Sequence, residues 1–334
     1  MKDTEAMLVI DDLQVKLFTE GGALPVLNHI NLSVRPGEIV GIVGESGCGK
    51  SMLASSVMGL IQSPGKITGG RILLGGNDLT GLTIRQYQRI RGSEIAMIFQ
   101  EPMTSLDPLM ACGRQIEEAI RAHERLPRAE LKRRAIEAIR KVGIPMPEKV
   151  YADIPSQLSG GMRQRIMIAM ALACHPRLLI CDEPTTALDV TIQAQILRLI
   201  RRLRNETGTA VIFISHDMGV ISETADRVAV MYAGEIVEEA DVKTMFESPA
   251  HPYAVGLQKA IPQSGHHQEA LHDIPGSVPM LNALPEGCLF HPRCPYAEPR
   301  CRAEHPELFD SDGHRCRCFR SAGHSAGERG EGIS

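Results

Sequence analysis

The chain has no tryptophan and few other aromatic residues, with seven phenylalanines and five tyrosines among 334 residues. Proteins that bind single-stranded nucleic acid stack the bases on aromatic side chains, so a stacking platform is not expected here. The net charge of −4 at pH 7 also provides no overall basic field to attract a polyanion. These two absences argue against a protein whose main partner is nucleic acid.

The chain also lacks a long hydrophobic run. Its longest apolar stretch is IMIAMALAC, residues 166–174, whereas a membrane-spanning helix needs about 18 or more apolar residues. The first residues, MKDTEAMLVIDDL, are acidic and mixed in polarity, and they contain no signal-peptide core. We therefore expect a cytosolic chain that does not cross a membrane. In that compartment disulfides are rare, and clustered cysteines more often hold metal.

Strand and helix patterns alternate through most of the chain, which predicts an α/β fold with a largely parallel sheet. The length favours two domains, or one large domain with an extension. After about residue 262 no regular pattern is readable, and the small, polar residues 321–334 are expected to be disordered. Predicted strands cover residues 7–17, 26–34, 38–44, 94–100, 177–183, 209–217 and 227–239. Predicted helices cover residues 50–60, 160–173 and 191–205, with two more in 114–142 that are separated near Leu126 and Pro127.

The segment GESGCGKS, residues 44–51, fits the phosphate-loop pattern G-x-x-x-x-G-K-[ST], and it lies between a predicted strand and a predicted helix, as that pattern requires. Backbone N–H groups of such a loop turn toward phosphate oxygens, and the helix N-terminus adds partial positive charge. We expect Lys50 to neutralise the β- and γ-phosphates and the Ser51 hydroxyl to bind Mg²⁺. The candidate nucleotide-binding residues are Gly44, Glu45, Ser46, Gly47, Cys48, Gly49, Lys50 and Ser51.

Two further motifs bear polar groups suited to the same chemistry. LLICDE, residues 178–183, is a predicted buried strand that ends in two adjacent carboxylates. Asp182 is expected to hold Mg²⁺, directly or through water, and Glu183 to act on the attacking water. An open α/β sheet places its ligands at this end of its strands. LSGGM, residues 158–162, opens a helix with a serine and two glycines, which is another N-terminus suited to an anion.

These motifs, with IFQEP around Gln100 and ISHD around His216, follow the order found in the ATP-binding cassette (ABC) family, which residues 7–262 resemble. The resemblance implies an ABC ATPase core with an antiparallel β subdomain and an inserted helical subdomain at about 101–173. It also implies a small cysteine-rich extension at 263–320, before the tail at 321–334.

The resemblance also implies roles for single residues. Two domains are expected to meet head to tail, so that ATP lies between the phosphate loop of one and Ser159, Gly160 and Gly161 of the other. Glu183 is expected to polarise the attacking water, His216 to steady the water and the γ-phosphate, and Gln100 to sense the γ-phosphate. Asp189 is expected at the dimer seam. Cys48 occupies a position that is often small; a thiol at a helix N-terminus can also have a lowered pKa, which leaves sensitivity to thiol reagents open.

The closer resemblance is to ATPases of bacterial dipeptide, oligopeptide and nickel importers. It is carried by VGESGCGKS, MIFQEPMTSLDP, DEPTTALDVTIQAQIL, HPYAVGL and PEGCLFHPRCPYAEPRC, and it reaches to about residue 320. It implies a peripheral ATPase at the cytoplasmic face of the inner membrane. The implied partners are a second, related ATPase subunit, two permease subunits and an external solute-binding protein. The sequence leaves open whether the solute is a dipeptide, an oligopeptide, nickel or something related.

The extension concentrates five cysteines: Cys288, Cys294, Cys301, Cys316 and Cys318. Their spacing is wider than the C-x2-C pairs of a zinc ribbon. Four thiolates can instead hold an iron–sulfur cluster, and the family resemblance implies a [4Fe–4S] cluster on Cys288, Cys294, Cys301 and Cys318. Cys316 is the alternative fourth ligand, and a zinc site or a reduced, metal-free segment stays open as well.

We therefore expect an importer ATPase that uses ATP and Mg²⁺. One rival is an ABC ATPase that acts on nucleic acid or ribosomes, but such proteins usually have coiled-coil insertions, two cassettes or basic surfaces, none of which is visible here. A second rival is a metal-binding regulator with a vestigial cassette. The intact Lys50, Ser51, Asp182, Glu183 and His216 argue against it.

Overall fold

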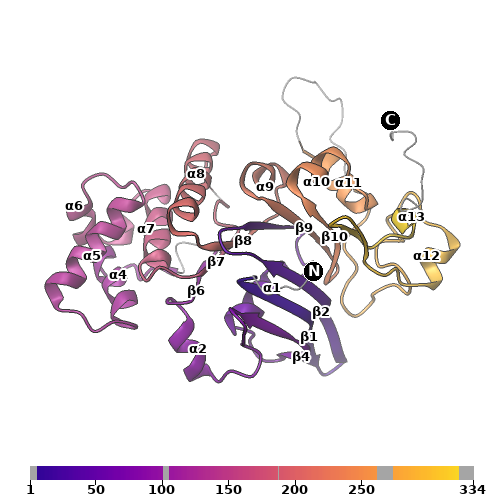
Figure 1. Cartoon of the computed structure of the whole chain (residues 1–334), viewed down its shortest axis with the longest axis horizontal. Helices are drawn as coiled ribbons and strands as arrows, with labels where there is room; N and C mark the ends of the chain where they lie inside the picture. Colours follow the sequence, from indigo (N-terminus) through magenta and orange to yellow (C-terminus); the bar gives the residue numbers. More distant parts are fainter. Residues whose placement is uncertain (1–5, 101–104, 187, 262–273, 323–334) are drawn as a thin grey trace.

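The computed structural model describes residues 6–100, 105–186, 188–261 and 274–322. Two β-sheets form its centre, a lobe of helices lies at one end, and the cysteine-rich extension lies at the other (Figure 1). A four-stranded antiparallel sheet packs beside an eight-stranded mixed sheet. This architecture confirms the α/β cassette with an antiparallel subdomain and a helical region.

The eight-stranded sheet has the order β11-β12-β10-β9-β3-β8-β7-β6. The strands from β9 to β6 run parallel to one another, and every residue of β3, β7 and β8 is buried. Strands that are covered on both faces are apolar throughout, which is why they appear in the sequence as continuous apolar runs. The strands are β3 (Ile39–Val43), β6 (Ile95–Ile98), β7 (Leu178–Asp182), β8 (Ala210–Ser215), β9 (Arg227–Tyr232), β10 (Glu235–Asp241), β11 (Phe309–Ser311) and β12 (His314–Cys316).

The antiparallel sheet has the order β2-β1-β4-β5, and its inner face packs against one face of the main sheet. Alternate residues of β8 illustrate how the main sheet is covered. Ile212 and Ile214 belong to the core shared with the antiparallel sheet, whereas Phe213 faces the core shared with the helical lobe. The strands of the smaller sheet are β1 (Leu8–Thr19), β2 (Gly22–Val34), β4 (Gly65–Leu74) and β5 (Asn77–Asp78).

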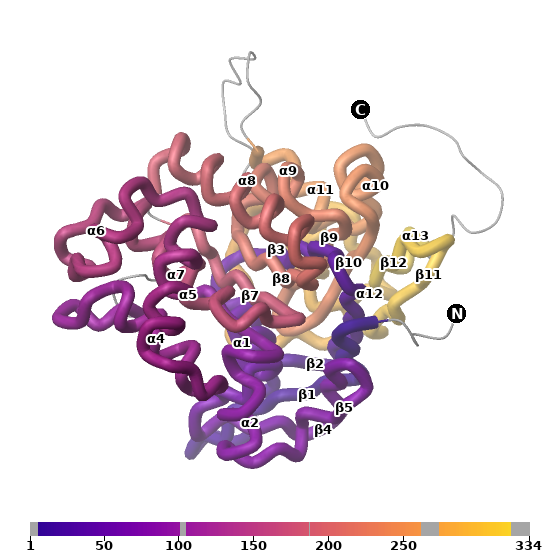
Figure 2. The backbone as a smooth tube through the Cα atoms, turned by 60° about the vertical axis from the view of Figure 1, so that its left-hand side comes forward, coloured from indigo at the N-terminus to yellow at the C-terminus, as the bar shows by residue number. Residues whose placement is uncertain are grey.

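Helices cover the main sheet and form the lobe (Figure 2). The helices around the sheets are α1 (Lys50–Met58), α2 (Ile84–Ile90), α8 (Val190–Thr207), α9 (Met218–Thr224), α10 (Val242–Glu247) and α11 (Pro252–Lys259). The lobe consists of α4 (Cys112–Arg121), α5 (Arg128–Lys141), α6 (Pro147–Ala152), the 3₁₀ turn η1 (Pro155–Gln157) and α7 (Gly160–Leu172). The two helices predicted within 114–142 are therefore present as α4 and α5.

The prediction of one strand at 227–239 is wrong, because the structure has two strands in this segment. The segment is a hairpin of β9 and β10, because the chain reverses at Ala233 and Gly234, whose φ angles are 45° and 85°. Two successive left-handed residues match the twist of a two-residue hairpin turn. Apolar residues occur both before the turn, in β9, and after it, at Ile236 and Val237, so the pattern predicts a single strand.

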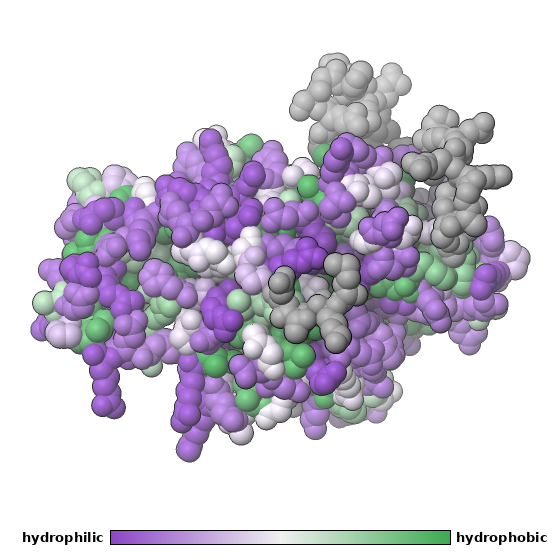
Figure 3. Space-filling view, in the orientation of Figure 1, coloured by the Kyte–Doolittle hydropathy of each residue, from purple (hydrophilic) through white to green (hydrophobic). Residues whose placement is uncertain are grey.

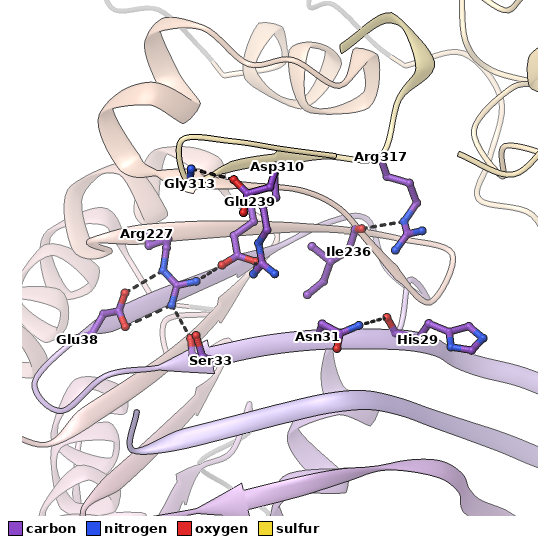
Figure 4. Close-up of polar contacts among 11 residues, drawn as sticks. His29, Asn31, Ser33, Glu38, Arg227, Ile236, Glu239, Asp310, Gly313 and Arg317 are labelled. Atoms are coloured by element: carbon purple, nitrogen blue, oxygen red, sulfur yellow. Dashed lines mark hydrogen bonds and ion pairs between the residues drawn. The ribbon is translucent and has the colours of Figure 1, made fainter. Parts of the chain in front are cut away.

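The extension contains more regular structure than the sequence indicated. It forms α12 (Pro299–Ala303), β11, β12 and α13 (Phe319–Ala322), and β12 pairs antiparallel with β10. Arg315 of β12 ties this region to the core, because its guanidinium binds Glu239 of β10. Glu239 also binds Arg227, whose guanidinium in turn binds Glu38 and the Ser33 carbonyl (Figure 4). Of the tail predicted to be disordered, residues 321–322 belong to α13 and residues 323–334 lie outside the described residues.

The face seen in Figure 3 is mostly hydrophilic, and its apolar residues are scattered in small groups. In the described ranges, no helix combines the length and the apolarity needed to span a bilayer.

Candidate functional site

The phosphate loop, residues 44–51, joins β3 to α1 and fits closely under its neighbours. A Cβ at Gly44 would lie 2.2 Å from the Met231 carbonyl oxygen, and a Cβ at Gly49 would lie 2.9 Å from Leu27 Cδ2. Gly49 also has a φ of 107°, a conformation that disfavours other residues. Glycine is therefore required at both positions for the loop to turn between the two sheets.

Lys50 lies over this loop in the position expected of a phosphate-binding cation. Its Nζ donates hydrogen bonds to the carbonyl oxygens of Gly44 at 2.7 Å and Glu45 at 2.9 Å. Lys50 is only 6% exposed, and its amino group lies among neutral carbonyl groups. The loop therefore holds a cation ready for an anionic ligand.

The lowered thiol pKa that was considered for Cys48 is wrong. Its side chain is completely buried, and burial raises the pKa of the thiol despite the nearby Lys50 ammonium. Cys48 therefore acts as a small apolar residue that packs beneath the loop.

Ser51 and Asp182 meet where Mg²⁺ was predicted. Ser51 Oγ donates to Asp182 Oδ1 over 3.3 Å, and Asp182 is the last residue of β7. Burial raises the pKa of Asp182, and the neighbouring Glu183 adds to this effect, while the hydrogen bond from Ser51 opposes it. A hydroxyl and a carboxylate are oxygen ligands of the kind that Mg²⁺ prefers.

Glu183 contacts the other two predicted catalytic residues, Gln100 and His216. Its Oε2 accepts hydrogen bonds from Gln100 Nε2 at 3.2 Å and Thr186 Oγ1 at 3.0 Å. Its Oε1 lies 3.2 Å from His216 Nδ1. These side chains follow the parallel neighbours β6, β7 and β8, whose carboxyl ends share one edge of the sheet. Glu183 also has a φ of 47°, and such strain is concentrated at functional sites.

Thr186 was missed in the sequence analysis. It lies three residues after Glu183 in the segment EPTT, and that spacing was the available signal.

The remaining ATP-site candidates lie at the starts of two neighbouring helices. Ser159 caps α7 by accepting a hydrogen bond from Met162 N, and Asp189 caps α8 by accepting one from Ile192 N. A Cβ on Gly161 would lie 2.8 Å from Ile192 Cγ2, so the two helix starts are packed together. The first N–H groups of a helix have no partner within it and are suited to bind an anion.

In the extension, four of the five cysteines line one small cavity. They are Cys288, Cys294, Cys301 and Cys318, with Phe290 and Tyr296 among the other lining residues. Cys316 lies instead in β12, where Ser321 Oγ is 3.0 Å from its Sγ. Burial raises the pKa of Cys288 to about 11. Among the described residues, no group of three or more His, Cys, Asp or Glu side chains is arranged to hold a metal ion.

His251, in the HPYAVGL motif, has a structural role. Its Nδ1 accepts a hydrogen bond from Tyr253 N, and burial lowers its pKa to about 3. It therefore serves as a neutral cap of α11.

The sequence analysis also missed a direct link between the extension and the phosphate loop. Arg293, next to Cys294, forms a bidentate ion pair with Glu45, with N–O distances of 2.9 and 3.0 Å. Tyr253 Oη accepts a hydrogen bond from Glu45 N at 2.8 Å. Both residues lie in motifs that were recognised, HPYAVGL and PEGCLFHPRCPYAEPRC, but only a three-dimensional structure brings them to the loop.

A larger cavity lies away from this chemistry. It is enclosed by the ends of α5, α7 and α8, and Arg133, Arg134 and Arg177 are among its lining residues. These three cations bind Glu130, Glu124 and Glu94, respectively. The cavity is thus a junction between lobe and sheet whose charges are already compensated.

Three family profiles match the chain, and one of them, described as "AAA domain, putative AbiEii toxin, Type IV TA system", matches residues 154–222. The profile described as "ABC transporter" matches residues 27–186, and the one described as "Oligopeptide/dipeptide transporter, C-terminal region" matches residues 237–301. The chain is 46% identical over 314 residues to the dipeptide transport ATP-binding protein DppD of Escherichia coli, which covers 94% of this chain and 96% of that protein. It is 47% identical over 315 residues to the oligopeptide transport ATP-binding protein AppD of Bacillus subtilis, with coverage of 94% and 96%.

Solved structures agree with the fold. The dimeric structure of MJ0796, a bacterial ABC transporter cassette, superposes with a TM-score of 0.64 at 28% identity and covers 71% of this chain and 99% of that chain. CbiO1 of Clostridium perfringens, part of an ABC transporter complex, gives a TM-score of 0.64 at 27% identity, with coverage of 73% and 92%. The chain belongs to the ABC transporter ATP-binding proteins of the dipeptide and oligopeptide family, and it is an ABC-type ATPase.

Proposed function

We propose that this ATPase powers the import of dipeptides or oligopeptides through a membrane permease complex. The observation that carries the proposal is similarity over nearly the whole chain to dipeptide and oligopeptide transport proteins, including the C-terminal region at residues 237–301. ABC cassettes of other transport systems share the core, whereas this region is described by the peptide family itself. The peptide class is therefore favoured over nickel, and over nucleic acid or ribosomes.

The ATP site operates at the carboxyl ends of the parallel strands. Lys50 and the loop N–H groups bind the β- and γ-phosphates. Ser51 and Asp182 would hold Mg²⁺, which would supply neutralisation of the charge on the phosphates. Glu183 accepts the proton of the attacking water. Gln100 and His216, which both contact Glu183, orient that carboxylate and respond to the γ-phosphate.

Hydrolysis is coupled to movement through a second subunit. Ser159, Gly160 and Gly161 of one subunit cover the ATP held by the phosphate loop of the other, and Asp189 lies at the same seam. Closure completes the site, and hydrolysis reopens it. The second subunit is a related but different ATPase, and the pair docks at the cytoplasmic face of the membrane on two permeases that receive substrate from an external binding protein.

Peptide uptake by the reconstituted complex tests this function. The chain, its ATPase partner and both permeases are placed in proteoliposomes with ATP inside and the loaded binding protein outside. We expect uptake of labelled di- or oligopeptide that requires internal ATP and disappears with Lys50→Ala in this chain. ATP-driven uptake of Ni²⁺ without peptide uptake, or ATPase activity stimulated only by ribosomes or DNA, would contradict the peptide assignment.

In the extension, the cysteine side chains favour a [4Fe–4S] cluster whose ligands are Cys288, Cys294, Cys301 and Cys318. Four thiols line one cavity, and thiolates are the usual ligands of such clusters. Zinc is less favoured because the sequence spacing of these cysteines is wider than the C-x2-C pairs typical of zinc ribbons. A bound cluster would join four separate parts of a segment that has little apolar core of its own.

Two cysteine variants test the cluster. We expect the anaerobically purified chain to be coloured and to contain about four irons with matching sulfide. Cys318→Ser should lose the colour and the iron, whereas Cys316→Ser, two residues away but outside the cavity, should keep both. A colourless chain with one zinc, or without metal, would contradict the cluster, and equal losses in both variants would contradict the choice of Cys318.

A further inference from the structure

The ion pair between Arg293 and Glu45 joins residues that are 248 positions apart in the sequence. Glu45 is the second residue of the phosphate loop, and its own carbonyl oxygen accepts a hydrogen bond from Lys50 Nζ. The Arg293 side chain is 6% exposed and that of Glu45 is 29% exposed. A bidentate pair that is shielded from water fixes both groups far better than a surface ion pair does.

Arg293 is itself held rigidly by the extension and the core. Its guanidinium donates to the carbonyl oxygens of Ile274 at 3.1 Å and Pro275 at 2.8 Å. It also lies 5.8 Å from the ring centre of Tyr232 and 5.9 Å from that of Phe290. Its orientation toward Glu45 is therefore set by several elements at once.

Tyr232 and Phe290 also contact a third aromatic residue, Tyr253, which binds the phosphate loop. Tyr253 packs against Tyr232 and Phe290, with ring centres 4.8 and 5.4 Å apart, and its hydroxyl accepts the hydrogen bond from Glu45 N. The backbone and the side chain of Glu45 are thus both held by residues that pack on the extension.

The charge on Glu45 matters because it lies in a loop that binds a polyanion. An uncompensated carboxylate there would repel the phosphates of ATP and compete for Lys50, whereas a paired carboxylate does neither. We propose that Arg293 is a positioning residue for nucleotide binding: it neutralises and orients Glu45, so that the folded extension sets the affinity of the phosphate loop for MgATP. This inference rests on the proposed ATP site, but it does not depend on which metal the cysteines hold.

The rival explanation is that Arg293 only anchors the extension. Arg317 provides the matched control, because it anchors the same segment elsewhere. It donates to the carbonyl oxygens of Ile236 (Figure 4) and Pro306 and pairs with Glu235. In the described part of the chain, none of these hydrogen bonds and ion pairs involves a residue of the phosphate loop. If Arg293 only anchored the extension, Arg293→Ala and Arg317→Ala should weaken MgATP binding to the same extent.

The test is titration of the purified full chain with MgATP. Arg293→Ala should raise the Kd about tenfold, as expected for a shielded charge pair, and Arg293→Lys should recover part of this loss because it restores the charge without the bidentate geometry. Arg317→Ala should stay within about twofold of the native Kd. In a Glu45→Gln background, Arg293→Ala should change the Kd by less than about twofold, because its partner charge is already gone.

Three outcomes would overturn the proposal: an unchanged Kd in Arg293→Ala, equal losses in Arg293→Ala and Arg317→Ala, or an Arg293→Ala effect that persists undiminished in the Glu45→Gln background. Failure of the ATP site itself is distinguishable, since the native chain would then not bind MgATP in the same titration.

Discussion

Replacing Lys50 with alanine is expected to lower ATP hydrolysis by at least about 100-fold, the usual cost of losing one electrostatic group that stabilises a transition state. The structure supports a large effect because Lys50 Nζ is already fixed over the loop by the carbonyl oxygens of Gly44 and Glu45. MgATP binding should weaken as well. In the native chain, MgATP at about 100 times its Kd should stabilise the fold by roughly 2.7 kcal/mol, and this gain should vanish in the variant.

The measurement is a thermal-unfolding series with and without MgATP, together with the ATPase rate of the assembled complex. Lys66→Ala is the control, since Lys66 lies on β4 beside Phe18 and outside the loop. It should keep both the ATP-dependent stabilisation and the rate. A Lys50→Ala variant with near-native turnover would rule out the phosphate loop as the site of hydrolysis.

The second large effect is expected for Glu183→Gln, which should bind MgATP but hydrolyse it about 10²- to 10⁴-fold more slowly. The amide has nearly the same shape as the carboxylate, and its oxygen can still accept the hydrogen bonds from Gln100 and Thr186. What it loses is the capacity to take a proton from water. Glu183→Gln should therefore lose hydrolysis but keep MgATP binding, whereas Lys50→Ala should lose both.

Single-turnover hydrolysis and an independent binding titration check this separation. Glu206→Gln makes the same chemical change at an exposed position of α8 and should leave both quantities unchanged. If Glu183→Gln hydrolyses ATP at a near-native rate, another group must activate the water. If it fails to bind MgATP, Glu183 belongs to the binding site and its assignment as base loses its support.

The parts of the site that were predictable are those encoded by short continuous segments. The phosphate loop, the LLICDE strand and the LSGGM helix start each combine a local conformation with the residues that use it, so reading the motif also located the groups. The roles of Gln100 and His216 came from the family resemblance. The structure gives the physical reason that they converge on Glu183, since all three residues follow parallel strands whose carboxyl ends share one edge.

The parts that were not predictable depend on contacts distant in sequence or on turns without a strong signal. The Arg293–Glu45 pair needs the extension to fold back onto the core, which no local pattern specifies. The hairpin at Ala233 was hidden because apolar residues lie on both sides of the turn, in β9 before it and at Ile236 and Val237 after it. The pairing of β12 with β10 was likewise missed, since a three-residue strand is too short to show a period of two.

That pairing has a consequence for how copies of the chain behave toward one another. Without β12, the main sheet would end in β10, a strand of seven residues with open backbone groups that could serve as a template for another chain. With the extension in place, the outermost strand is instead β11, which has three residues and includes Asp310. The opposite edge is β6, with four residues. Short edge strands pair poorly with neighbours, and β11 also has a charged residue, so the folded extension protects this edge of the ATPase from strand-to-strand aggregation.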